Sequence, residues 1–397
     1  MAPRSATASP TRTERLPRRA SMEREDLAGW LRLAATPQIG NASARRLLAA
    51  FGLPEQVFAA GADALSALLT PVQSRALAAE PPGFAELLDA TWDWLQAAPA
   101  ERRIWTLADP GYPAALLHTR DPPLLLHGMG HALANGPVAW PQAIAIVGSR
   151  NPTAQGVTNA RQFARSFAAT GWCVVSGLAL GIDAAAHEGA LEGASAGALA
   201  TVAVVGTGLD RVYPRQHLEL AHRIAQQGLL LSEYPLRTPP LAGNFPGRNR
   251  IISALGPGTL GVEAALQSGS LITARMAAEQ GREVFAIPGS IHSVQSRGCH
   301  ALLKQGAKLV ETAQDVLDEL RPGAVAAPAV QPLASPAPDA RADEVLRALG
   351  FDPATLDALQ ARTGLPTATL QARLLELELA GEVARLPGGL FQRTGSA

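Results

Sequence analysis

The chain has 397 residues, of which 47% are hydrophobic and 17% charged, and its formal net charge at pH 7 is +0. This length favours two or three domains, and the balance of charge excludes a polycation that binds nucleic acid over its whole surface. Gly, Ser or charged residues interrupt every apolar run, so we expect no membrane span. The two cysteines lack CxxC spacing and the eight histidines are scattered, which favours a reducing cytoplasmic location and no metal site.

Residues 1–22 are rich in Arg, Ser, Thr and Pro and carry no apolar stretch of the kind that secretory signals need. We expect a disordered tail there. A transit peptide is the alternative, and Met22 is an alternative start of translation.

Residues 23–90 are rich in alanine and leucine at helical spacing and predict a helical domain. The segment from Gln38 to Leu48 resembles the turn of a helix–hairpin–helix, or SAM-like, module. Gly40 would offer backbone N–H groups to a phosphate, and Arg45 and Arg46 follow it. We therefore expect a secondary DNA contact at these three residues, with a purely structural helical module as the alternative.

Residues 91–320 predict an α/β domain. The stretch 108–130 contains several Pro and Gly turn signals and is expected to be loop-rich. After it, apolar runs alternate with helical patterns such as 155–169 and 215–227. The alternation predicts a Rossmann-like, doubly wound and mostly parallel sheet, with strands near 144–147, 172–176, 201–205, 229–232, 259–262, 284–287 and 309–310.

Loops that follow these strands carry small residues and arginines. Gly148-Ser149-Arg150 follows the first predicted strand, and Arg215 lies in the loop after the third, behind Tyr213-Pro214. Ligands of open α/β sheets bind where such loops gather, at the carboxyl ends of the strands. Backbone N–H groups and arginines at this edge predict a site for a polyanion.

Two further segments extend the predicted site. Phe245-Pro-Gly-Arg248-Asn249-Arg250, expected in a loop, sets an aromatic ring beside two arginines and an amide, and Ser268-Gly269-Ser270 supplies hydroxyls and backbone donors. Arginine combined with an aromatic ring is typical of single-stranded nucleic-acid binding, in which bases stack and phosphates pair. For Asn249 and Arg250, bracing of the loop remains an alternative.

Enzyme motifs are weak in this chain. There is no P-loop, and the first strand is not followed by the glycine pattern of a dinucleotide site, so we expect no cofactor and no catalytic residue. Asp183 and His187 are interpreted as a capping carboxylate and a packed ring. Glu263 follows a broken glycine-rich loop similar to that of nucleotide-cleaving Rossmann hydrolases. A nucleotide or nucleoside-phosphate hydrolase is therefore the alternative function.

The C-terminal part begins with a Pro- and Ala-rich stretch, 321–340, which predicts an extended linker. Residues 341–397 then predict a winged-helix domain, with helices beginning near 352 and spanning 368–380, and a hairpin over 383–391. The second helix carries Arg373 but also Glu376 and Glu378. Since a DNA reader should be basic there, we favour a protein contact, with a ligand-sensing regulator as a third alternative function.

Several long motifs in fixed order are similar to those of a known family. They are Val147-Gly-Ser-Arg150, Ser176-Gly-Leu-Ala-Leu-Gly-Ile-Asp-Ala-Ala-Ala-His187, Gly206-Thr-Gly-Leu-Asp210, Tyr213-Pro214, Phe245-Pro-Gly-Arg-Asn-Arg-Ile-Ile252, Ser268-Gly-Ser-Leu-Ile-Thr273 and Ile287-Pro-Gly289. In these the chain closely resembles the bacterial DNA-processing protein A family (DprA, also called Smf).

This resemblance implies a recombination mediator without catalytic turnover. Such a protein binds and protects incoming single-stranded DNA during natural transformation in competent cells, loads the RecA recombinase onto it, and forms a homodimer through its Rossmann-like domain. It also implies that Arg150 and Arg215 are phosphate ligands, Arg215 standing where many members have lysine. The remaining implied DNA-binding residues are Gly148, Ser149, Phe245, Arg248, Asn249, Arg250, Ser268, Gly269 and Ser270.

Overall fold

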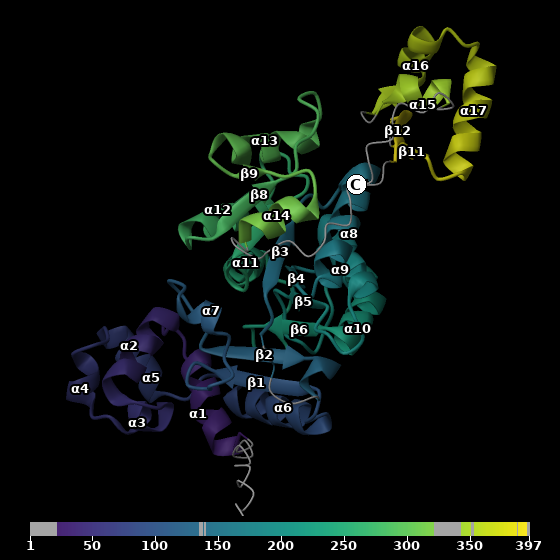
Figure 1. The fold of residues 1–397 in the computed structure, drawn as a ribbon. Helices are drawn as coiled ribbons and strands as arrows, with labels where there is room; N and C mark the ends of the chain where they lie inside the picture. The colour runs from purple at the N-terminus through teal and green to yellow at the C-terminus, as the bar shows by residue number, and fades with distance from the viewer. Residues whose placement is uncertain are drawn as a thin grey trace, which may run out of the picture.

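The structure is a computed structural model that describes residues 22–134, 138, 140–320, 343–350, 353–386 and 388–394. Nearly all of the predicted tail and the whole predicted linker lie outside these residues. Figure 1 shows a helical N-terminal part, a large sheet covered by helices and a small C-terminal domain. Across the described segments, no helix combines the length and apolar character that a membrane crossing needs.

The large sheet confirms the predicted mostly parallel fold. Its strand order is β1-β2-β6-β5-β4-β3-β7-β8-β9. All neighbouring strands from β6 to the β9 edge of this order pair in parallel, whereas β1 with β2 and β2 with β6 pair antiparallel. The strands are β1 (Arg102–Thr106), β2 (Leu125–Met129), β3 (Ala143–Val147), β4 (Cys173–Ser176), β5 (Thr201–Val204), β6 (Leu229–Ser232), β7 (Gly258–Gly261), β8 (Glu283–Ala286) and β9 (Lys308–Leu309).

Each strand predicted from an apolar run forms, but β1 and β2 were not predicted. The stretch 108–130 was expected to be loop-rich, and strand β2 within it was not foreseen. Gly128 is not a turn residue there. It pairs with Arg103, and a Cβ on it would lie 2.3 Å from the Trp105 ring, so the missing side chain makes room for a buried tryptophan.

Alternate side chains of β3 pack on opposite faces of the sheet, as the pleat requires. Ile144 and Ile146 contact the cluster under α8, α9 and α14, whereas Ala145 and Val147 contact the cluster under α7 and α11. Helix α10 covers the same face of the sheet as α9, and α12 and α13 cover the same face as α11.

The helices of this domain are α7 (Ala114–Leu117), α8 (Ala154–Ala169), α9 (Ile182–Gly193), α10 (Leu218–Gln227), α11 (Asn244–Ala254), α12 (Ser270–Glu279), α13 (Arg297–Lys304) and α14 (Ala313–Leu320), with 3-10 turns η1 (His131–Leu133), η2 (Arg215–His217) and η3 (Val294–Ser296).

The N-terminal part is helical, as predicted. It comprises α1 (Arg24–Ala35), α2 (Asn41–Phe51), α3 (Pro54–Ala59), α4 (Ala62–Ser66), α5 (Pro71–Ala78) and α6 (Phe84–Ala97). The turn between α1 and α2 ends at Gly40, the N-cap of α2. Helix α6 crosses the predicted boundary between residues 90 and 91 and contacts both α1 and β1.

The C-terminal domain has the predicted winged-helix arrangement, with the sheet order β10-β12-β11. Helix α15 was not predicted; its leucines join the small core. The elements are α15 (Glu344–Leu349), β10 (Ala354–Thr355), α16 (Leu356–Thr363), α17 (Thr367–Leu379), β11 (Val383–Leu386) and β12 (Leu390–Arg393).

Candidate nucleic-acid interface

The carboxyl edge of the parallel strands collects most of the predicted site. Strand β3 lies between β4 and β7. The chain builds the sheet from β3 through β4 and β5 to β6 on one side, and then from β7 through β8 to β9 on the other side. This is the switch point at which open α/β sheets form a ligand crevice. The loops after β3 and β7 flank it, and helices α8, α9 and α12 begin at the same edge.

The loop after β3 is closely packed against the start of α9. A Cβ on Gly148 would lie 2.6 Å from the Ile182 side chain, so only glycine fits. The Ser149 hydroxyl accepts a hydrogen bond from the Asn151 backbone at 3.1 Å, and its carbonyl accepts from Ile182 N–H at 3.1 Å. Arg150, by contrast, is exposed. The loop therefore fixes the backbone and leaves one guanidinium toward solvent.

Phe245 and its neighbours lie in helix α11, not in a loop as the sequence analysis expected. Pro246 and Gly247 suggested a loop, but a proline in the first turn of a helix has no intrahelical hydrogen bond to lose. Ile251 and Ile252, both buried, hold the helix on the sheet. Docking of this apolar side overrides the local glycine and proline signals.

Arg248, predicted as one of the DNA-binding residues, is buried. Its exposed fraction is 4%, and its guanidinium donates to the carbonyls of Gly177 (2.6 Å) and Val204. Burial, together with the charge of nearby Arg150, lowers the pKa of Arg248 to about 10, while Asp183 opposes this shift. Arg248 thus braces the loop after β4 and the end of β5.

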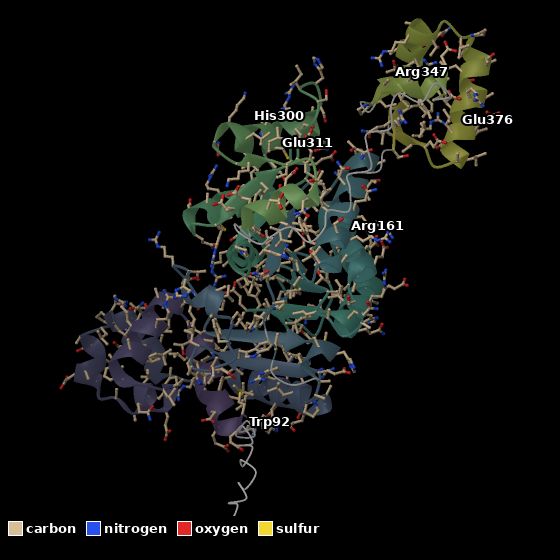
Figure 2. The ribbon with its side chains drawn as sticks, viewed as in Figure 1. Trp92, Arg161, His300, Glu311, Arg347 and Glu376 are labelled. Carbon is tan, nitrogen blue, oxygen red and sulfur yellow. The ribbon has the colours of Figure 1, made fainter. Side chains whose placement is uncertain are left out.

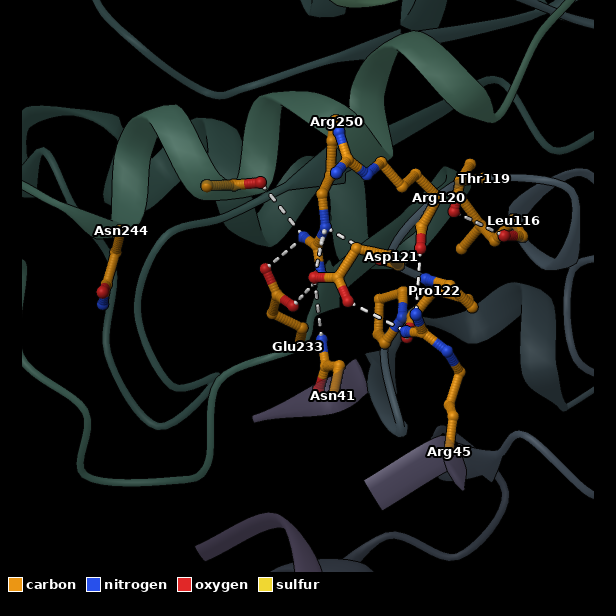
Figure 3. A network of polar contacts seen from close by, with 12 residues as sticks. Asn41, Arg45, Leu116, Thr119, Arg120, Asp121, Pro122, Glu233, Asn244 and Arg250 are labelled. Atoms are coloured by element: carbon orange, nitrogen blue, oxygen red, sulfur yellow. Dashed lines mark hydrogen bonds and ion pairs between the residues drawn. The ribbon is translucent and has the colours of Figure 1, made fainter. Parts of the chain in front are cut away.

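Arg250 also braces the structure, which was the alternative role predicted for this residue. It donates to both carboxylate oxygens of Glu233 at 2.6 Å, to the Asp121 carbonyl at 2.9 Å and to the Gly247 carbonyl at 3.0 Å. Figure 3 shows the side chain of Arg250 beside Glu233 and Asp121. With these donors engaged, Arg250 fixes α11 against the end of β6. Asn249 is half-buried beside it.

Two aromatic rings meet at the loop after β5. The centroids of Tyr213 and Phe245 are 5.5 Å apart, with an interplanar angle of 39°. Tyr213 is 48% exposed, and Phe245 is half-buried over Gly206, whose Cβ would lie 3.0 Å from the ring. Arg215, exposed, follows on η2. Tyr213 belongs to one of the sequence motifs but was not predicted as a site residue. Its aromatic ring, two residues before Arg215, was a signal that could have indicated this role.

Ser268 and Ser270 face each other at the beginning of α12. Their hydroxyl oxygens are 2.7 Å apart, and the Ser270 N–H donates to the Ser268 hydroxyl at 3.3 Å. Gly269 between them is exposed, with open space where a Cβ would be. The three residues form a compact polar turn after β7, on the far side of β3 from the aromatic rings.

The carboxylates and the histidine that suggested an enzyme are engaged in holding loops. Asp183 accepts from the N–H groups of Gly177 and Ala179 at 3.1 and 3.2 Å. It therefore braces the loop after β4 and is not the expected helix cap, because the N-cap of α9 is Gly181. His187 is fully buried and bonds to the Thr201 hydroxyl at 2.7 Å. Burial, reinforced by the charge of Arg248, lowers its pKa to about 3. Both groups are thus part of the scaffold under the site.

Glu263 bonds to the start of helix α8. Its carboxylate accepts from the hydroxyl and the N–H of Thr153 at 2.6 and 2.9 Å. Burial raises its pKa, and the Thr153 bonds oppose that rise. Its side chain also fills the space where Gly156 would carry a Cβ. The carboxylate on which the hydrolase alternative depends is therefore used to join β7 to α8.

The predicted secondary contact in the helical part is only partly open. Gly40 and Arg46 are exposed, and Arg46 donates to the Ser43 hydroxyl at 3.2 Å. Arg45 instead donates to the Asp121 carboxylate and to the Arg120 carbonyl, both at 2.9 Å. Its guanidinium joins α2 to the loop before β2, which does not fit a free phosphate ligand.

The winged-helix domain presents a mixed and partly neutralised surface. Arg373 of α17 forms ion pairs with Asp343 and Glu376. Glu376 is exposed on the same helix (Figure 2). The one arginine of the expected recognition helix thus has acidic partners, consistent with the preference for a protein contact.

Comparison with known proteins identifies relatives of the whole arrangement. The family model for DNA recombination-mediator protein A matches residues 103–321, and the model for the DprA winged helix domain matches residues 327–389. Protein Smf of Escherichia coli is 44% identical over 293 residues, covering 70% of this chain and 74% of the relative. DNA processing protein DprA of Bacillus subtilis is 42% identical and covers 53% of this chain and 68% of the relative. The X-ray structure of DNA processing protein A from Streptococcus pneumoniae matches with a TM-score of 0.57 and 33% identity, over 76% of this chain and 99% of the other.

Proposed function

The chain belongs to the DNA recombination-mediator protein A family (DprA/Smf), and from this premise we propose that it binds single-stranded DNA along the carboxyl edge of its parallel sheet. The observation that carries the proposal is the pair of exposed arginines, Arg150 and Arg215, with the Tyr213–Phe245 rings beside Arg215. Guanidinium groups pair with phosphates, and exposed ring faces stack on unpaired bases.

Each residue of the proposed site has a distinct role. Arg150 and Arg215 bind phosphates. Their loops follow β3 and β5, and these two strands lie two strand spacings, or about 10 Å, apart in the sheet. Phe245 and Tyr213 receive a base. Gly148 keeps the first loop tight. The neutral donors are Ser149, Ser268, Gly269 and Ser270. Arg248 and Arg250 hold α11 in place through their hydrogen bonds, and Asn249 lines the site between them.

The cellular role follows from the family. We propose that the protein protects incoming single-stranded DNA during natural transformation and loads the RecA recombinase onto it. It acts in the cytoplasm as a homodimer formed through the sheet domain, and it works by binding, without turnover or a cofactor. The engagement of Glu263 by Thr153 supports binding over hydrolysis.

Fluorescence anisotropy with the full chain tests the core of this proposal. Labelled oligo-dT and a duplex of equal length are titrated at two salt concentrations. We expect tighter binding to the single strand and an affinity that falls with salt, because phosphate contacts release counterions. Equal or preferential binding to the duplex contradicts the proposal.

A second experiment tests the partner. RecA is added to oligo-dT that is already coated with a single-strand-binding protein, with and without the chain. We expect faster filament assembly, measured as the onset of ATP hydrolysis by RecA. No acceleration, at concentrations where the chain binds DNA, would contradict the loading role alone. Light scattering of the chain in solution tests the homodimer.

A further inference from the structure

The loop before β2 joins two parts of the molecule through one carboxylate. Asp121 accepts hydrogen bonds from Asn41 at 3.2 Å and from Arg45 at 2.9 Å, both on α2 of the helical part. On its other side lies Arg250 of α11, whose guanidinium Nε lies 3.5 Å from the carboxylate and donates to the Asp121 carbonyl at 2.9 Å. Figure 3 shows these side chains converging on Asp121 from the two sides.

Arg250 carries this link into the proposed DNA site. Its guanidinium is also held by both oxygens of Glu233, which follows β6. Arg250 and Glu233 are mostly buried, with side-chain exposed fractions of 16% and 13%. Phe245 precedes Arg250 on the same helix by five residues, or about 7.5 Å along the axis. A change in the hold on Arg250 therefore displaces or loosens the turn that carries Phe245.

Phe245 has little freedom to compensate for such a shift. Its ring packs on Gly206 and against Tyr213, and the side chain of its neighbour Asn244 donates to the Gly206 carbonyl at 3.0 Å. The aromatic platform therefore depends on where α11 is held. The helical part reaches that helix through the contacts of Asn41 and Arg45 with Asp121.

We propose that Asp121 is a positioning residue for DNA binding: by tying Asn41 and Arg45 of the helical part to Arg250, it holds helix α11 where Phe245 meets a base. This inference rests on the proposed function. It assigns the helical part an effect on the sheet-domain site that needs no contact between Arg45 and DNA.

The charge of Asp121 makes the test sharp. Removing a carboxylate near a polyanion site should by itself strengthen DNA binding, because a repulsive charge is lost. Loss of a positioning contact should weaken it. We expect Asp121→Ala to weaken oligo-dT binding by roughly three- to tenfold, the usual size of coupling through a packed network. The slope of log affinity against log salt should stay unchanged, because no phosphate ligand is lost.

The matched control is Asp89→Ala. It removes the same charge and another ion pair of the helical part, that with Arg24, but not a contact to α11. It should leave oligo-dT affinity within twofold of the wild type. Arg45→Ala should weaken binding like Asp121→Ala, the double variant should be no weaker than either single one, and Arg45→Lys should restore part of the affinity.

Thermal unfolding shows separately whether each variant is folded. If Asp121→Ala does not fold, Asp121→Asn replaces it in the binding experiment. Unchanged or tighter binding in a folded Asp121 variant overturns the inference. So does a reduced salt slope in Arg45→Ala, since this would make Arg45 a direct ligand. If the wild-type chain itself does not bind oligo-dT, the proposed function fails first, and the two failures are thereby distinguished.

Discussion

The rings of Tyr213 and Phe245 lie 5.5 Å apart at an angle of 39°, one from the loop after β5 and the other from the first turn of α11. Nearly half of Tyr213 is exposed, so the pair offers an aromatic surface beside Arg215. We expect Phe245→Ala to weaken oligo-dT binding by about 1–3 kcal/mol, the contribution of one stacked base. Anisotropy titration measures this.

Tyr213→Ala should lower affinity in the same direction, and Phe58→Ala, at a half-buried phenylalanine of the helical part, should not. If Phe245→Ala binds oligo-dT as the wild type does, the ring belongs to the core and not to the site.

Arg150 and Arg215 are expected to act as phosphate ligands, because both are exposed on the loops of the carboxyl edge. Each alanine variant should reduce the magnitude of the log affinity–log salt slope by about 0.7, since one counterion fewer is released per lost contact on a single strand. Titrations at four salt concentrations give the slope. Arg165→Ala, exposed on α8 away from these loops, is the control; an equal change in all three variants would point to general electrostatics.

Arg250 should matter first for stability. Arg250→Ala leaves the Glu233 carboxylate, 13% exposed, without its bidentate partner. We expect a loss of about 3–5 kcal/mol in the free energy of unfolding, because an unpaired buried charge is costly. Urea unfolding measures it. Arg150→Ala should unfold like the wild type. An Arg250→Ala protein that is as stable as the wild type, and whose log affinity–log salt slope falls by about 0.7, would instead make Arg250 a phosphate ligand.

His187 should make the protein less stable in mild acid. Burial lowers its folded-state pKa to about 3, whereas the unfolded ring titrates near 6.5, so between these values the unfolded state binds the extra proton. The contribution of His187 is full above about pH 6.5 and falls as the pH drops toward 3, by about 2 kcal/mol between pH 8 and pH 5.

Urea unfolding of the wild type and of His187→Gln at these two pH values tests this effect. The variant should be less stable at pH 8 yet lose less stability on acidification. Parallel losses in the two proteins would show that the ring is not held neutral.

An experiment on Glu263 distinguishes the proposed DNA-binding function from the hydrolase alternative. We expect no free base when the chain is incubated with nucleoside monophosphates, as followed by chromatography. Glu263→Gln should chiefly lower the melting temperature, because Thr153 loses a charged hydrogen-bond acceptor. Base release by the wild type that disappears in this variant would favour the hydrolase alternative.

The sequence alone determined the fold class and the parallel strands. Buried parallel strands are continuous apolar runs, as at 144–147 and 229–232, and local chemistry suffices to find them. Strand β2 was missed because turn signals at 109–113 and 121–123 dominate its surroundings, and the packing of Gly128 against Trp105 is visible only in the folded chain. Order within the sheet, including the antiparallel edge, depends on long-range pairing.

The sequence also predicted one site for Arg150, Arg215 and Phe245, because loops at the carboxyl ends of parallel strands gather at one edge, although Phe245 itself lies in α11. It could not sort the arginines by role. Arg248 and Arg250 lie two residues apart beside Phe245, yet both face inward to carbonyls and carboxylates from distant segments. Which guanidinium remains open to a phosphate is decided by packing, since partners such as Gly177, Glu233 and Asp121 meet these side chains only in the folded chain.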